Sequence, residues 1–220
     1  MFKQSLIRLA AAVALCGVAS AASASVITLD FEGLRDGEQI LNFYNGGTGS
    51  LGSSGVNYGV AFGSNALALV DADAGGGGNF ANEPTPDTIM FFLTGSAVLN
   101  YAPGFTTGFS FWYTTLNLGG TVSVYDDVNA GGNLLGTINL QALGGNCSGD
   151  PSGQFCNWAI GALAFNGVAK SIDFGGTVNQ VGFDNITFGS TDPNRVPAPA
   201  TLALVGAALL GLGAARRRSA

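Results

Sequence analysis

Histidine is absent from the 220-residue chain. Its absence excludes Ser-His-Asp and Cys-His catalysis, histidine metal ligands and a histidine pH switch. Basic residues are also scarce. Between Val26 and Ser190 only Arg35 and Lys170 are basic, against 13 acidic residues, which gives this body a net charge of −11. A body this acidic repels a phosphate backbone, so nucleic acid is excluded as a partner.

The body also lacks any stretch with sustained helical periodicity. Short apolar or alternating runs, separated by Gly, Asn, Asp and Ser, predict ten strands instead. These are Val26–Phe31, Ile40–Tyr44, Ala66–Val70, Thr88–Leu93, Gly108–Thr115, Thr121–Tyr125, Leu134–Leu140, Trp158–Phe165, Lys170–Phe174 and Gln180–Phe188. Closely spaced strands without helical crossovers favour an all-β fold, a single antiparallel β-sandwich of the jelly-roll type over residues 25–190. Most of the 35 glycines are then turn residues.

The N-terminus has the three parts of a secretory signal peptide. Lys3 and Arg8 form a basic region, Leu9–Val18 is apolar, and Ala22-Ser23-Ala24 supplies small residues for cleavage. We expect residues 1–24 to form a signal helix that is removed on export. The alternative is a buried N-terminal helix of the fold.

The C-terminus carries a second hydrophobic segment. Thr201–Ala215 is uncharged and is followed by Arg216, Arg217 and Arg218. Counted from Pro199 the segment has 17 residues, which is near the short limit for crossing a bilayer. We therefore predict a transmembrane helix at 200–215, a basic cytoplasmic tail at 216–220 and a linker at 191–199. This tail would hold an exported domain at the membrane transiently.

The order of parts in this tail resembles a PEP-CTERM sorting signal. The residues that carry the likeness are Val196-Pro197-Ala198-Pro199, the apolar segment and the three terminal arginines, with Ala198 where the family motif has Glu. The body resembles members of this group in Leu29–Leu34, Gly104–Phe111, Val124–Asp127 and Val181–Ile186. The resemblance implies processing by exosortase, a membrane protease of Gram-negative bacteria that make exopolysaccharide. An ordinary C-terminal membrane anchor is the alternative.

Three acidic residues on the two terminal strands form a candidate calcium site. Asp30 and Glu32 are two residues apart, so both would project from the face opposite Leu29 and Phe31. Near Asp184 the alternation of the last predicted strand changes phase, which indicates a bulge. Because a jelly roll commonly places its first and last strands side by side, Asp30, Glu32 and Asp184 would meet and bind a structural Ca²⁺. The alternative is that these acids face solvent.

The two cysteines of the mature chain flank a Gly- and Pro-containing loop. Cys147 and Cys156 are predicted to form a disulfide, as exported proteins favour. The bridge would stiffen the loop beside Phe155 and Trp158, two aromatic residues that are candidates for carbohydrate contact. A purely structural loop, with both tryptophans in the core, is the alternative.

Together these features predict an exported, non-enzymatic protein of the cell surface or extracellular matrix, associated with exopolysaccharide. A specific carbohydrate-binding lectin or adhesin is the second hypothesis. A third is a glycoside-cleaving enzyme, which would need a pair of suitably spaced carboxylates.

Overall fold

The computed structural model describes residues 26–146 and 153–194, and every regular element within them is a strand. The strands are β1 (Ile27–Leu29), β2 (Val60–Phe62), β3 (Leu67–Val70), β4 (Thr88–Phe91), β5 (Ala97–Phe105), β6 (Phe109–Thr115), β7 (Gly120–Tyr125), β8 (Leu134–Leu140), β9 (Trp158–Leu163), β10 (Ala169–Gly176) and β11 (Val181–Phe188).

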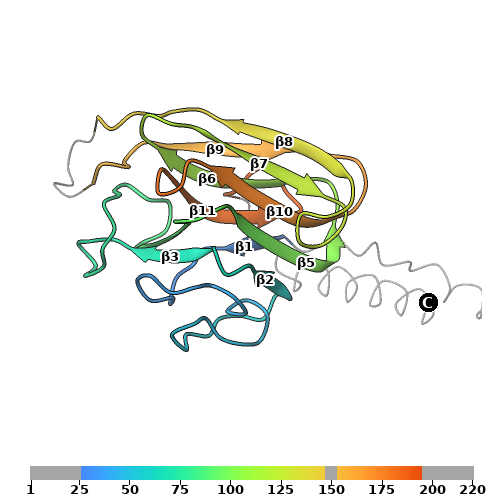
Figure 1. Cartoon of the computed structure of the whole chain (residues 1–220), viewed down its shortest axis with the longest axis horizontal. Coiled ribbons are helices and arrows are strands. Elements are labelled where there is room, and N and C mark those ends of the chain that lie inside the picture. Colours follow the sequence, from blue (N-terminus) through green and yellow to red (C-terminus); the bar gives the residue numbers. More distant parts are fainter. Residues whose placement is uncertain (1–25, 147–152, 195–220) are drawn as a thin grey trace, which may run out of the picture.

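The strands form two antiparallel sheets that lie face to face (Figure 1). Sheet A has the order β3-β4-β11-β6-β9, with β1 also paired to β11, and sheet B has the order β2-β5-β10-β7-β8. The predicted all-β, two-layer antiparallel architecture is therefore confirmed, whereas the jelly-roll assignment stays a prediction. The predicted signal and transmembrane helices, at 1–24 and 200–215, lie outside the described residues.

Aromatic side chains fill the space between the sheets. Phe109, Phe111 and Tyr113 of β6 are all buried, as their alternation predicts. The ring of Phe174, from sheet B, lies 5.7 Å from that of Phe111. Trp112 has the opposite phase, is half-buried and donates a hydrogen bond from Nε1 to Asn194 Oδ1 at 3.3 Å. Sheet A thus has an inner apolar face and an outer face that the loops cover.

The first and last strands are neighbours, as the sequence predicts. β1 pairs with the second half of β11, from Ile186 to Phe188, and β4 pairs with the first half at Phe183. The register of β11 against β6 shifts between Asp184 and Thr187, and Asn185 between them has a φ of 48°. The predicted bulge is therefore present, at the point where the edge partner of β11 changes from β1 to β4.

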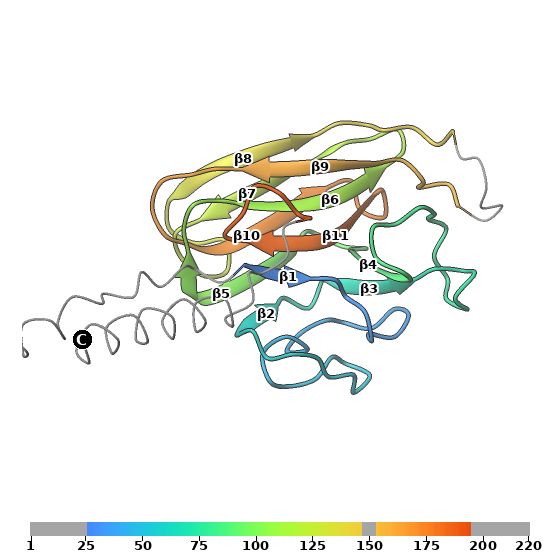
Figure 2. The same ribbon diagram turned by 180° about the vertical axis from the view of Figure 1, so that it is seen from behind.

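One predicted strand is wrong, and two strands were missed. Segment Ile40–Tyr44 is a run of turns beside β1 and β2 (Figure 2), although Ile40 and Tyr44 are buried. Strands β2 and β5 were not expected. β5 contains Pro103, which lies in a bulge between β5 and β10. Asn100 pairs with Ser171 and Phe105 with Ala169, so β5 advances five residues where β10 advances two, and Pro103 needs no partner in the ladder.

Candidate functional site

The predicted calcium ligands converge on one loop, the segment before β4. Asp184 is fully buried at the bulge of β11. Its Oδ2 accepts hydrogen bonds from Thr85 N at 2.9 Å and Thr85 Oγ1 at 2.7 Å, and its Oδ1 accepts one from Asn185 N at 2.7 Å. Glu32 Oε1 accepts from the backbone N–H groups of Asp87 at 3.1 Å and Thr88 at 3.0 Å. The two carboxylates therefore anchor residues 85–88 to β11 and to the end of β1.

Asp30 lies beside this anchor but with other partners. β1 ends at Leu29, and Phe31 has a φ of 63°, so the strict alternation expected for Asp30 and Glu32 is wrong. Asp30 Oδ1 accepts hydrogen bonds from Glu32 N and from the Tyr44 hydroxyl, both at 3.3 Å. Burial, and next the charge of Asp30, raise the pKa of Tyr44 well above its usual range.

Burial makes this region unfavourable for negative charge. It raises the pKa of Asp184 to about 7; hydrogen bonds from Thr85 and Asn185 oppose this rise, and the charge of Glu32 adds to it. Burial likewise raises the pKa of Glu83 to about 7, and the nearby Asp71, among other acids of the same loop, acts in the same direction. The segment between β3 and β4 carries Asp71, Asp73, Glu83 and Asp87 and no basic residue, so its formal charge is negative.

The donors around these carboxylates bear directly on the calcium hypothesis. Asp30, Glu32 and Asp184 are brought to one junction, but each accepts hydrogen bonds from backbone or hydroxyl groups. Within residues 26–146 and 153–194, no three acidic or cysteine side chains are grouped so as to hold a metal ion. The calcium site stays a prediction, which melting in excess chelator can test.

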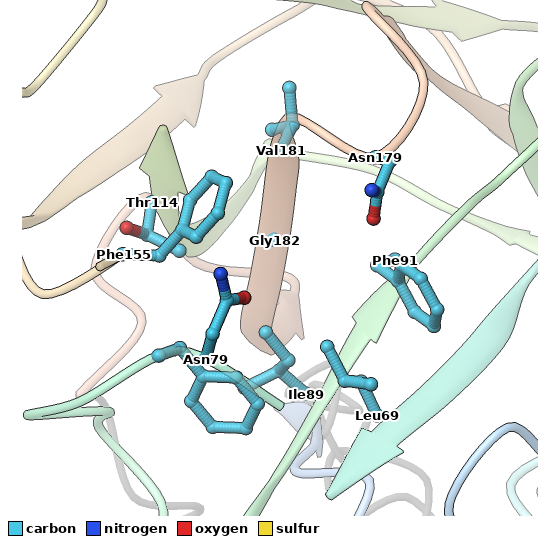
Figure 3. Close-up of a pocket in the computed structure, with 10 residues that line it drawn as sticks. Leu69, Asn79, Ile89, Phe91, Thr114, Phe155, Asn179, Val181 and Gly182 are labelled. Atoms are coloured by element: carbon cyan, nitrogen blue, oxygen red, sulfur yellow. The ribbon is translucent and has the colours of Figure 1, made fainter. Parts of the chain in front are cut away.

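A second feature lies on the outer face of sheet A, and we call it the outer-sheet hollow (Figure 3). It is shallow and opens to solvent, and its accessible volume is only about 20 Å³, enough for about one water molecule. Strands β3, β4, β6 and β11 supply its base, and three loops supply the rest. The lining residues are Leu69, Asn79, Phe80, Ile89, Phe91, Thr114, Phe155, Asn179, Val181 and Gly182.

The wall that carries Phe155 is held in place by its backbone. Asn79 O accepts hydrogen bonds from Gln154 N at 2.6 Å and Phe155 N at 3.1 Å, and Ala81 N donates to Phe155 O at 3.1 Å. Phe80 and Phe155 form a parallel bridge. These contacts fix two distant loops side by side over the sheet, so the hollow has a defined shape.

Rings and amides face one another across the hollow. The rings of Phe155 and Phe91 lie on opposite sides, and the amides of Asn79 and Asn179 point into the space between them (Figure 3). Neither amide hydrogen-bonds another residue in the described part of the chain. Asparagine amides both donate and accept hydrogen bonds, so the hollow combines apolar walls with free polar groups.

The structure separates the two predicted carbohydrate contacts. Phe155 lines the hollow, whereas the half-buried Trp158 donates a hydrogen bond from Nε1 to Ala81 O at 2.9 Å and supports the loop from beside it. Phe91, Asn79 and Asn179 were not predicted. The asparagines lie in turn-rich segments whose sequence indicates loops and carries no signal for a site.

Several predicted residues cannot be placed. Cys156 is buried, but Cys147 lies outside the described residues, so the disulfide stays a prediction. The sorting motif at 196–199 and the arginines at 216–218 lie outside them too. In the described segments, no helix has the length and apolar character needed to cross a membrane.

No family model and no curated protein matches the chain. Among solved structures it is similar to a carbohydrate-binding module from Cellvibrio mixtus lichenase 5A in complex with cellotriose, with 16% identity over 59% of this chain and 89% of that chain and a TM-score of 0.36. It is also similar to the K3 cleaved adhesin domain of Lys-gingipain from Porphyromonas gingivalis, with 14% identity over 76% of this chain and 93% of that chain and a TM-score of 0.33. Likenesses this weak assign neither a family nor a function.

Proposed function

We propose that this chain is an exported, non-enzymatic protein of the cell surface or extracellular matrix that binds polysaccharide through the outer-sheet hollow. The observation that carries the proposal is the pair of free amides, on Asn79 and Asn179, aimed between the rings of Phe91 and Phe155 (Figure 3).

This arrangement suits the two surfaces of a sugar ring. The C–H groups of a pyranose form an apolar face that packs on an aromatic ring, and its hydroxyls need partners that donate and accept hydrogen bonds. Asn79 and Asn179 offer both functions without breaking a bond to the described residues. Sites of this kind are largely apolar, with a few well-placed polar groups.

The proposal includes the route by which the protein reaches its place. The signal peptide at 1–24 would direct export, and the tail from Val196 to Arg218 would hold the protein at the inner membrane until an exosortase-type protease removes it. Mass spectrometry of the protein, with and without that protease, would give both termini and show whether Ala198 permits processing. A tail that stays on the protein both in cells with the protease and in cells without it would contradict this route.

Binding to the exopolysaccharide of the producing cell tests the function. Affinity electrophoresis of the full-length chain should show retardation by the polysaccharide, and Phe155→Ala should weaken binding about tenfold or more, because a buried aromatic contact is lost. Tyr125→Ala is the matched control, since Tyr125 is also half-buried but lies on sheet B. Binding that survives both Phe155→Ala and Asn79→Ala would overturn the assignment of the site.

The lectin or adhesin hypothesis makes a different prediction with the same protein. A specific lectin binds one defined oligosaccharide on a glycan array, whereas a matrix component retains the bulk polymer. Trp158→Ala would weaken binding to the oligosaccharide and to the bulk polymer alike, because Trp158 supports the loop through its hydrogen bond to Ala81 O.

A further inference from the structure

We infer that the free edge of β9 is a docking surface for a second copy of this chain, which pairs with it strand to strand in an antiparallel dimer. β9 supplies no residue to the outer-sheet hollow, so this pairing does not depend on the proposed function. Three features of the molecule carry it: the hydrogen bonds at the sheet edges, the regularity of β9 and the distribution of charge along the chain.

The sandwich ends in β2 and β3 on one side and in β8 and β9 on the other (Figure 2). On the first side, residues 37–44 form turns that hydrogen-bond the outer edges of both strands. Phe62 N, on β2, donates to Leu41 O at 2.8 Å, and Ala68 N, on β3, donates to Glu38 O at 2.8 Å. The edges on this side are therefore already occupied by the chain itself.

The edge of β9 has no such cover among the described residues. β9 pairs with β6 from Trp158 to Leu163 without a shift of register. None of its backbone N–H or C=O groups bonds any described residue outside this ladder. In an antiparallel ladder alternate residues direct these groups to the two sides of a strand, so the outer side of β9 presents a regular row of unpaired donors and acceptors.

The remaining edges are less suited to pairing. β8 lies beside β9 but advances two residues, from Leu134 to Gly136, where β7 advances one. A bulge of this kind twists an edge and interrupts its hydrogen-bonding row. β1 is a further edge strand of sheet A and has only three residues. β9 is thus the longest regular edge without a partner in the described part of the chain.

The side chains of β9 do not protect it either. Natural sheets usually block a free edge with a charged residue, most often lysine, or with proline. The strand reads WAIGAL and has neither, and Ile160 near its middle is 45% exposed. Such an edge favours the addition of another strand.

The charge of the chain favours a second copy as the partner. Between Leu134 and Val168 the only charged residue is Asp150, whereas the body from Val26 to Ser190 has a net charge of −11. Two copies repel one another through most of this acidic body, but not through an uncharged edge. A second copy also supplies a strand of the same length and the same regularity.

The symmetry of this pairing places one side chain near the axis. Two identical antiparallel strands are related by a two-fold axis, and sheet A then continues from one copy into the other. Ile160 faces outward together with Trp112, its partner on β6. Its neighbour Gly161 instead pairs with Phe111, which is in the core. Because Ile160 is near the middle of β9, the axis brings the Ile160 side chains of the two copies close together on the outer face.

Cross-linking of the full-length chain in detergent solution tests this arrangement. Ile160→Cys should be joined to its counterpart in a second copy by a short bis-maleimide. Leu93→Cys is the matched control, because Leu93 is 50% exposed but follows β4, and the parent chain with its own three cysteines gives the background. At about 100 μM, a concentration suited to a small and weak interface, Ile160→Cys should yield at least about fivefold more covalent dimer than Leu93→Cys. Equal yields would overturn the inference.

A pair of charged variants provides a second measurement, by sedimentation equilibrium in density-matched detergent. Ile160→Lys and Ile160→Glu should each weaken the dimer about fivefold, because like charges then lie opposite one another across the axis. An equimolar mixture of the two should regain the lost affinity, since opposite charges meet. Leu93→Lys should associate as the parent does, and circular dichroism checks that every variant folds. Association that is the same in all variants, or a mixture that associates no better than either variant alone, would show that β9 does not pair with its own copy.

Discussion

Thr114 offers a sharp test of the structure, because its hydroxyl gains nothing from the fold. The side chain is 0% exposed, and Oγ1 has no hydrogen-bond partner among the described residues. A buried, unpartnered hydroxyl costs about 1–3 kcal/mol. Valine has nearly the same shape and favours strands. Thr114→Val should therefore raise the free energy of unfolding by roughly 1–2 kcal/mol, and the melting temperature by about 2–4 °C for each kcal/mol.

The neighbouring residue is the matched control. Thr115 is equally buried, but its Oγ1 donates to Gln141 O at 2.8 Å and accepts from Leu143 N at 3.0 Å. Thr115→Val should lower the free energy of unfolding by about 1–3 kcal/mol, since two backbone groups lose their partner. Urea unfolding and thermal melting of the full-length chain, followed by circular dichroism, measure both. If Thr114→Val destabilises the protein as Thr115→Val does, then the Thr114 hydroxyl is not without a partner in the folded protein.

Three further predictions concern the acids and the core. The free energy of unfolding should rise as pH falls from about 8 to about 4, because Asp184 and Glu83, each with a pKa raised to about 7, bind protons more tightly in the folded state. Urea titrations at several pH values measure this dependence. Asp184→Asn should make the stability vary less with pH, and a pH dependence equal to that of the parent would contradict the prediction. Excess chelator should lower the melting temperature if the proposed calcium is bound, and an unchanged value would remove the calcium hypothesis. Gly161→Ala should destabilise the protein by about 1–3 kcal/mol, because its Cβ would lie 2.6 Å from Phe111 Cε2 in the core, and a melting temperature equal to that of the parent would contradict this packing.

The inner faces of the strands could be predicted because alternation is a local property. Phe109, Phe111 and Tyr113 point to one side whatever strand pairs with β6, and the phase change at Asp184 indicates a bulge without knowledge of the partner. The adjacency of β1 and β11 followed from the architecture expected for a chain of short strands.

The errors arose where the partner decides the structure. Ile40–Tyr44 is apolar enough for a strand, but Leu41 has a φ of 45° and the segment packs its buried residues as turns. β5 has weak local signals because it contains Asn100, Pro103 and Gly104, yet β2 and β10 pair with it on its two sides. Tertiary context thus overrode local propensity twice: a strand-like segment folds as turns, and a segment with weak strand propensity forms a strand.

The hollow could be predicted only in part for the same reason. Phe155 stood out because it lies beside a cysteine in a loop, but its partners come from segments far apart in the sequence. Asn79 and Asn179 line the same hollow only because β3, β4 and β11 are neighbours in sheet A. Neither asparagine differs, in sequence, from the many turn asparagines of this chain.

The acids of the body also have a role that their sequence does not reveal. Oxygens of the fully buried Glu38 accept backbone hydrogen bonds from Arg35, Leu51 and Ser53. Its burial acts to raise the pKa, but the hydrogen bond from the Ser53 hydroxyl and those from the three backbone groups together outweigh it and lower the pKa. Asp36, Glu32 and Asp184 likewise accept hydrogen bonds from backbone N–H groups within the loop between β3 and β4 and at the strand ends beside it.

A loop-rich sandwich leaves many backbone donors outside its ladders, and each buried donor needs an acceptor. Carboxylates supply two oxygens apiece, so a chain with long glycine-rich loops can use acids where a helical protein uses intrahelical carbonyls. Glu32, Asp36, Glu38 and Asp184 therefore serve the fold as acceptors for such donors. The anchored loop between β3 and β4 also places negative charge beside the hollow, because it supplies Asn79 and carries Asp71, Asp73 and Glu83.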